Sequence, residues 1–163
     1  MSGADILKFI SPRSSAGRDV VESHIADLSA RIASIARESG PTESDLLLAI
    51  EAIEDGFALW DADDRLVLCN GKYREIYAMG EDLFVRGAPF RDIVAECTRR
   101  GQFADAGLDL ETWIEACVRR HHEASGRYEE LLADGRRLLI HERRLANGGI
   151  VGVRVDITET KPR

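Results

Sequence analysis

The chain has 163 residues, of which 44% are hydrophobic and 31% charged, and this composition is typical of one globular domain with room for an extra helix. Its formal net charge of −7 argues against nucleic acid as a partner, because phosphate binding needs a concentrated basic surface. No segment approaches the roughly 20 apolar residues of a membrane helix. The apolar cluster at residues 6–10 is too short for a signal peptide, so we expect a cytoplasmic protein without membrane insertion.

The N-terminal part of the chain predicts a mobile lead-in over residues 1–17 and an amphipathic helix over residues 18–39. Apolar residues recur in this helix at alternating steps of four and three, as they do in the seam of a coiled coil: Val21, Ile25, Leu28, Ile32 and Ile35. A stripe of about 20 Å is too short to be stable alone. It must therefore pack against a twin helix or against its own domain. We favour a homodimer through this helix, with the predicted sheet as the alternative dimer surface.

A second helix is predicted over residues 45–54, because Gly40 and Pro41 end the first one and Thr42 or Ser44 can cap the next. A break at residues 55–56 leads into a β-hairpin. Its strands are expected within residues 55–61 and 65–70, joined by the acidic turn Asp61-Ala62-Asp63-Asp64.

Three further helices are predicted over residues 71–79, 91–100 and 110–124. The first is expected to turn Tyr73 and Tyr77 toward the interior. In the third, His121 continues an apolar stripe formed by Leu110, Ile114 and Cys117. This histidine is therefore expected either to face the interior or to lie near the end of the helix, where the helix dipole favours a charged imidazole.

Residues 128–157 predict a three-stranded antiparallel meander. Asp134-Gly135 and Asn147-Gly148 each separate two apolar runs, and such pairs are the strongest short-range signal of a hairpin. His141 lies in the middle strand, where apolar and polar residues do not alternate cleanly. It is expected either on the sheet surface or in the interior, where it could hydrogen-bond a small ligand.

The order of elements over residues 44–159 resembles that of a PAS domain. The resemblance is carried by three segments: Asp55-Gly56-Phe57-Ala58-Leu59-Trp60-Asp61, Val67-Leu68-Cys69-Asn70, and the stretch from Gly148-Gly149 to Asp156-Ile157-Thr158. It implies an α+β fold with a five-stranded antiparallel sheet and helices on one face, here preceded by the N-terminal helix. The chain is most similar to the PAS modules placed ahead of bacterial histidine kinases and diguanylate cyclases.

The resemblance implies a sensory or adaptor function in bacterial signal transduction. In such modules the terminal motif, here Asp156, Ile157 and Thr158, couples the last strand to a following helix by hydrogen-bonding the chain ends. Residues 160–163 are expected to form a tail. Met1 and the end at Arg163 favour a free-standing adaptor that contacts a separate histidine kinase, cyclase or other signalling protein. The sensor portion of a longer kinase or cyclase is the alternative.

Three common motifs of enzymes are missing from the sequence: a phosphate-binding glycine loop, a glycine-elbow serine and the metal-binding pattern His-Glu-x-x-His. We therefore predict that it is not an enzyme. Some PAS domains hold haem through a histidine on the long helix, where His121 and His122 lie here. Haem, flavin and a small ligand contacted by Tyr73, Tyr77 or His141 are alternatives to ordinary core packing.

The three cysteines, Cys69, Cys97 and Cys117, are widely spaced and odd in number. This arrangement matches neither a disulfide framework nor a zinc site. We expect them to be buried as small apolar residues.

Overall fold

The computed structural model describes residues 42–124 and 126–159. The expected lead-in over 1–17, the helix over 18–39 with its apolar stripe, and the tail over 160–163 lie outside these residues. Contacts divide the chain into two units, residues 1–54 and 55–163.

Helix α3, Glu43–Ala52, is the described part of the first unit. Thr42 is its N-cap, and a reciprocal pair of hydrogen bonds fixes the start of the helix. The backbone N–H of Asp45 donates to Oγ1 of Thr42 at 3.1 Å, and the backbone N–H of Thr42 donates to Oδ2 of Asp45 at 3.0 Å. This capping box satisfies N–H groups that a helix start leaves unpaired. It selects Thr42 rather than Ser44 as the cap, and the helix begins two residues earlier than predicted.

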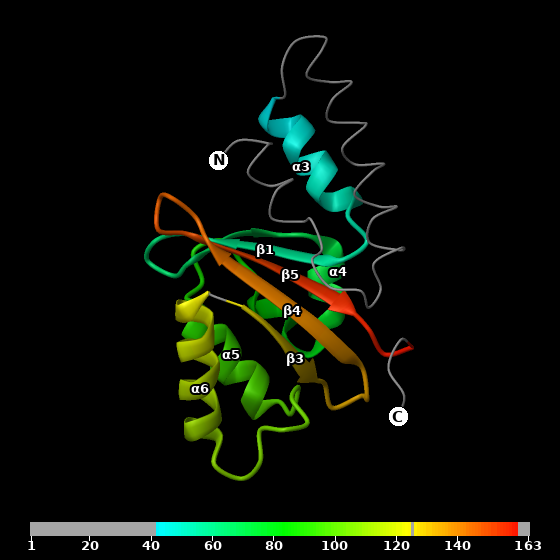
Figure 1. Cartoon of the computed structure of the whole chain (residues 1–163), viewed down its shortest axis with the longest axis vertical. Coiled ribbons are helices and arrows are strands. Elements are labelled where there is room, and N and C mark those ends of the chain that lie inside the picture. The colour runs from blue at the N-terminus through cyan, green and yellow to red at the C-terminus, as the bar shows by residue number, and fades with distance from the viewer. Residues whose placement is uncertain (1–41, 125, 160–163) are drawn as a thin grey trace. The chain divides into compact units, whose positions relative to one another are not determined.

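The second unit contains a five-stranded antiparallel sheet, as predicted (Figure 1). Its strands are β1 (Gly56–Trp60), β2 (Leu66–Cys69), β3 (Arg127–Leu131), β4 (Arg137–Arg144) and β5 (Ile150–Asp156). They lie in the order β2-β1-β5-β4-β3, so pairing of β1 with β5 joins the first hairpin to the C-terminal meander. The two glycines of the predicted turns, Gly135 and Gly148, have φ of 93° and 86°, a conformation that L side chains avoid.

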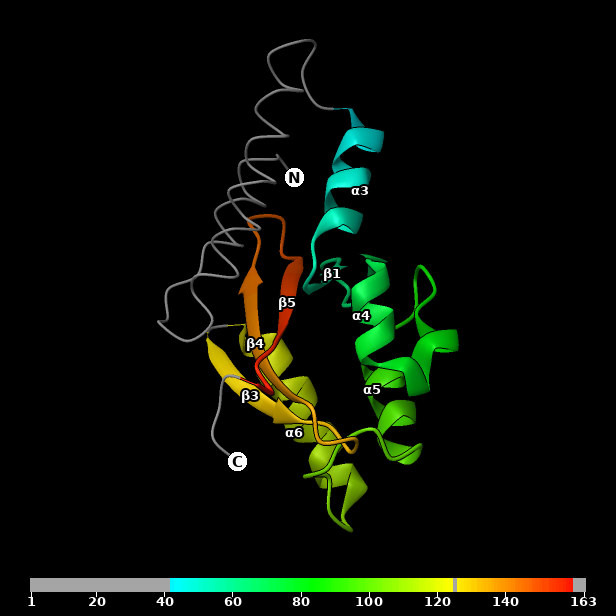
Figure 2. The same ribbon diagram turned by 90° about the vertical axis from the view of Figure 1, so that its right-hand side faces the viewer.

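The helices of this unit are α4 (Gly71–Ile76), the 3₁₀ helix η1 (Ala78–Leu83), α5 (Phe90–Arg99) and α6 (Leu110–Glu123). Figure 2 shows α4 and α5 on one side of the strands. The single helix predicted over 71–79 is wrong in its second half. Tyr77 ends α4 with a non-helical backbone, φ −105° and ψ 46°, and the chain continues as η1.

Asn70 holds the first hairpin against α4. Its side chain is fully buried and accepts hydrogen bonds from the backbone N–H groups of Phe57 and Tyr73, both at 3.0 Å. Its amide nitrogen donates to the backbone carbonyl of Asp55 at 2.9 Å. One side chain thus caps the helix and fixes the strand before it, which places Tyr73 on the inner side of the sheet.

The end of β5 is tied back to the start of β4. The backbone N–H of Ile157 donates to the carbonyl of Arg137 at 2.8 Å, and the N–H of Arg137 donates to Oγ1 of Thr158 at 2.9 Å. The N–H of Thr158 donates to Oδ1 of Asp156 at 3.0 Å. Asp156 and Thr158 therefore make the predicted hydrogen bonds to chain ends, and their part in signal coupling stays a prediction.

Candidate functional site

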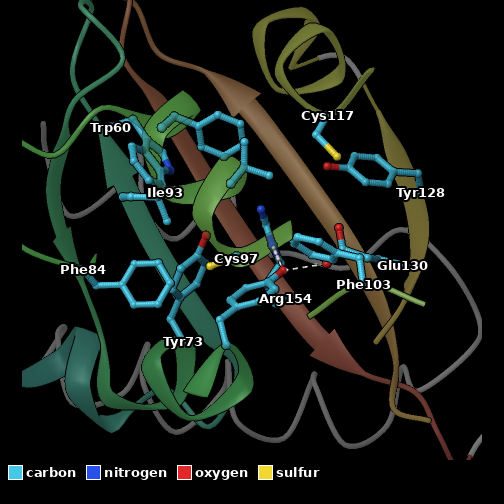
Figure 3. A pocket seen from close by; sticks show the side chains of 13 residues that line it. Trp60, Tyr73, Phe84, Ile93, Cys97, Phe103, Cys117, Tyr128, Glu130 and Arg154 are labelled. Atoms are coloured by element: carbon cyan, nitrogen blue, oxygen red, sulfur yellow. Dashed lines mark hydrogen bonds between the residues drawn. The ribbon is translucent and has the colours of Figure 1, made fainter. Parts of the chain in front are cut away.

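A cavity of about 40 Å³ lies in the second unit, between the inner face of the sheet and the helices (Figure 3). This volume has room for about three water molecules. Aromatic side chains form much of its wall: Trp60, Tyr73, Tyr77, Phe84, Phe90 and Phe103. Two pairs of these rings meet edge to face, Trp60 with Phe90 at 5.1 Å between centroids and Tyr73 with Phe84 at 5.3 Å, and this arrangement suits the charge distribution of aromatic rings.

Arg154 brings a guanidinium group into this apolar surround, and its side chain is only 4% exposed. Its Nε donates to the hydroxyl of Tyr77 at 3.0 Å, and its Nη2 donates to Oε1 of Glu142 at 3.2 Å. Gly152, two residues earlier on β5, makes room for it, because a Cβ there would lie 2.8 Å from Nη1. The glycine lets the guanidinium lie close over the inner face of the sheet.

Glu142 begins a row of charged groups that leads from the cavity to the surface. Nδ1 of His121 lies 2.5 Å from Oε2 of Glu142, and Nε2 of His121 lies 2.6 Å from Oδ1 of Asp64. Nε2 of His122 lies 2.8 Å from the other oxygen of Asp64. The side chain of His121 is fully buried and that of His122 is 54% exposed. We call these five residues, Arg154, Glu142, His121, Asp64 and His122, the polar chain.

The geometry of His121 requires an added proton in the polar chain. Both ring nitrogens face carboxylate oxygens, which can only accept, so either the imidazole is charged or one carboxyl is protonated. Burial alone would lower the pKa of His121, but hydrogen bonds and charges of Asp64 and Glu142 outweigh it and raise that pKa. The ring also stacks on Phe90, with centroids 3.7 Å apart, where a cation is attracted to the aromatic face.

The carboxyl groups of the site differ in their pKa. Burial would raise the pKa of Glu142, but the charge of Arg154 and a hydrogen bond to His121 outweigh it and lower that pKa. Burial would also raise the pKa of Asp64, but hydrogen bonds to His121 and His122 outweigh it there. Burial raises the pKa of Glu130, which lines the cavity and accepts a hydrogen bond from the hydroxyl of Tyr77 at 2.9 Å. The polar chain thus holds ionised carboxylates, while Glu130 retains its proton more readily.

Of the three residues predicted from sequence as contacts of a small ligand, two line the cavity and one does not. Tyr73 and Tyr77 line the cavity, whereas His141 lies on β4 between Ile140 and Glu142, which face the interior, and is not among the lining residues. Of the two outcomes expected for His141, its place on the strand favours the sheet surface. Ligand binding by any of these side chains stays a prediction.

His121 does not fit a haem ligand, since carboxylates hold both of its ring nitrogens and a cavity of about 40 Å³ is far smaller than haem. The same volume does not accommodate a flavin ring system. Among residues 42–124 and 126–159, no cluster of His, Cys, Asp and Glu is arranged to hold a metal ion.

The three cysteines are free and buried, as predicted. Cys97 and Cys117 line the cavity. Burial raises the pKa of Cys97 to about 12 and also raises the pKa of Cys117, so both side chains stay protonated thiols at neutral pH.

Sequence reasoning missed the polar groups that matter most here, namely Arg154, Glu142, Asp64 and Glu130. Counting every second residue from Ile140 would have put Glu142 on the inner face, and counting from Ile150 would have done the same for Arg154. No sequence signal links Asp64 to a histidine 57 positions later.

Comparison with known proteins agrees with this architecture. The protein-family model described as the PAS fold matches residues 50–163, which is most of the chain. The chain therefore belongs to the PAS fold family, whose members are sensory domains of signalling proteins. Within the described residues, no helix is both long and apolar enough to cross a membrane.

Among curated proteins, the chain is 30% identical over 147 residues to the non-motile and phage-resistance protein of Caulobacter vibrioides. The match covers 88% of this chain and 14% of that protein, so the chain corresponds to a small part of this relative.

Solved structures with a similar fold include the PAS domain of Bordetella pertussis BvgS, with a TM-score of 0.47, 17% identity, and coverage of 70% of this chain and 85% of that one. The sensor region of a sensor histidine kinase gives a TM-score of 0.49 at 17% identity, covering 92% of this chain and 56% of that one. Similarity of this size carries no information about ligand or partner.

Proposed function

We propose that this chain is a sensory or adaptor PAS module of bacterial signal transduction, which detects a small molecule in its cavity and regulates a signalling protein by contact. Membership of the PAS family supports the sensory part of this proposal. The observation that carries the proposal is the polar chain, because it joins a cavity-lining group, Arg154, to a surface group, His122, through consecutive polar contacts.

The polar chain suggests how occupancy of the cavity would be passed on. A ligand that accepts a hydrogen bond from Nη1 of Arg154 would pull on the same guanidinium group whose Nη2 donates to Glu142. A weaker hydrogen bond from Arg154 to Glu142 changes how strongly that carboxylate binds His121 on α6. His121 also contacts Asp64 in the turn between β1 and β2. Binding would thereby bias how α6 packs on the sheet, provided that the ligand prefers one of the two packings.

We further propose that the chain acts as a homodimer through the apolar stripe of residues 18–39. In the full chain, Leu28→Glu and Ile32→Glu should each give monomers in light scattering while circular dichroism shows a folded domain, because a buried charge at a helix seam is costly. Ala30→Glu, on the opposite side of the same predicted helix, is the matched control and should stay dimeric. If all three variants remain dimeric, the dimer interface lies elsewhere, for example on the sheet.

The contact with a signalling protein is tested by cross-linking the tagged chain in its own cells and identifying what it captures. We expect a histidine kinase, a cyclase or another signalling protein, captured less by a monomeric variant than by the Ala30→Glu control. Capture of no signalling protein under conditions where the chain is abundant would contradict the adaptor role.

A second candidate is the N-terminal sensor portion of a longer histidine kinase or diguanylate cyclase. The observation in its favour is that the chain matches only 14% of the length of its curated relative. Reading the genomic frame beyond Arg163 separates the two candidates, because a stop codon there excludes the longer enzyme and an open frame encoding a kinase or cyclase excludes the adaptor.

A further inference from the structure

Two buried hydrogen-bond donors at the cavity lack an acceptor. They are Nη1 of Arg154 and Nε1 of Trp60, and neither donates to any group in the part of the chain that the structure describes. Both residues line the cavity, and Figure 3 shows the indole nitrogen and the end of the guanidinium turned toward the same space. Leaving such a buried donor unpaired destabilises a domain. An acceptor placed in the cavity would recover much of this cost.

The buried cations near the cavity already have partners. Nη2 of Arg154 donates to Glu142, and the ring nitrogens of His121 lie against Glu142 and Asp64. Glu130 also lines the cavity, but burial raises the pKa of its carboxyl group, so it retains its proton more readily and supplies no cation. A carboxylate ligand would therefore lie beside Glu142 without a cation of its own, and an unpaired buried charge is strongly destabilising. An uncharged acceptor meets both donors without this penalty.

The size of the cavity limits the ligand further. At roughly 10–15 Å³ for each water-sized group, a cavity of about 40 Å³ suits three to four non-hydrogen atoms, as in a small ketone or amide, and not an extended ring system. The aromatic walls, including Tyr73 and Phe90, contact the apolar part of such a group. The upper limit of binding energy per atom gives a ligand of four non-hydrogen atoms a dissociation constant of about 40 μM or weaker.

We propose that the cavity binds a small uncharged molecule whose carbonyl or comparable acceptor atoms take hydrogen bonds from Arg154 and Trp60. This inference rests on the sensory function proposed above and names the chemical class of the molecule that is sensed.

The test uses three probes with four non-hydrogen atoms each: acetone, which is an uncharged acceptor, isobutene, which has its shape without the oxygen, and acetate, which is an anion. The chain has two tryptophans, and the indole N–H of each gives a separate NMR signal. Nε1 of Trp113 is also buried without an acceptor, but Trp113 does not line the cavity, so its signal is an internal control. Acetone should shift the Trp60 signal downfield in a saturable way and leave Trp113 unchanged.

We expect acetone to bind at least about tenfold more tightly than isobutene or acetate, since isobutene accepts no hydrogen bond from the two donors and acetate brings an unpaired charge. Trp60→Phe should weaken acetone binding about tenfold, as read from the methyl signals of Ile93, which lines the cavity. Trp113→Phe is the matched control and should bind acetone as the unaltered chain does.

Three results would overturn the proposal. Tightest binding of acetate would make the site an anion site, and equal binding of isobutene would show that the two donors take no part. If the Trp60 indole signal does not shift up to about 100 mM acetone, a concentration well above the expected dissociation constant, water is the partner of both donors. None of these results bears on dimerisation or partner capture, which are measured without a ligand, so failure here is distinct from failure of the adaptor role.

Discussion

Replacing His121 by phenylalanine tests the polar chain at its centre. The change keeps an aromatic ring against Phe90 but removes both N–H groups, so that Glu142 and Asp64 each lose a partner. Breaking a buried ion pair in this way costs about 3–5 kcal/mol. Glu142 retains Arg154 and Asp64 retains His122, so we expect the lower end of this range, about 3 kcal/mol, or a melting temperature about 10 °C lower.

The effect should depend on pH in a defined direction. The pKa of His121 is raised on folding, so its contribution is complete below its unfolded pKa near 6.5 and is lost as pH rises through the folded pKa. The pKa of Asp64 and of Glu142 is lowered, so their contributions persist above about pH 4 and fail only on acidification. The deficit of the His121→Phe variant should therefore be largest between about pH 5 and pH 6.5 and should shrink toward pH 8.

The assay is urea denaturation of the unaltered chain and of both variants at about pH 5.5 and pH 8. At pH 8 roughly a quarter of the unfolded thiols are ionised, but all three chains carry the same cysteines, so this leaves the difference between them unchanged. His122→Phe is the matched control, since His122 contacts the same carboxylate but is 54% exposed, and it should change stability by less than about 0.5 kcal/mol. Equal losses in the two variants, or a His121→Phe deficit that does not change with pH, would contradict a buried charged contact of His121 with Glu142 and Asp64.

Two further substitutions test the contacts that position the site. Asn70→Ala should lower the free energy of unfolding by about 3 kcal/mol, because it removes the acceptor of two buried N–H groups, those of Phe57 and Tyr73, and a donor to the part-buried carbonyl of Asp55. A loss below about 1 kcal/mol in urea denaturation would contradict this. Thr158→Val should cost about 1 kcal/mol and speed hydrogen exchange of the Arg137 amide, whereas Thr158→Ser should retain the slow exchange. Slow exchange in both variants would show that the hydroxyl does not hold the strand end.

Elements of this fold that depend on local chemistry could be predicted from sequence. Asp134-Gly135 and Asn147-Gly148 encode tight turns, and the structure has a hairpin at each. The stripe on residues 110–124 correctly gave α6 and pointed to His121 as a possible interior residue. Periodicity finds such elements because it reflects which side of each one is buried.

The partners of His121 could not be predicted in the same way. Glu142 and Asp64 lie 21 and 57 positions from it, and which strand residue meets which helix residue depends on register and packing. The continuous apolar run ahead of His141 also hides the alternation that places Glu142 inside. A buried carboxylate, moreover, is unexpected until its partners are known, since it is stable only when they are present.

The central claim is that occupancy of the cavity reaches the surface through the polar chain. The most direct test follows the ring ¹⁵N signals of His121 during the acetone titration, with His141, which is not among the residues lining the cavity, as the reference. We expect the His121 signals to move with the same dissociation constant as the Trp60 indole signal. Saturation of Trp60 with no response at His121 would contradict it.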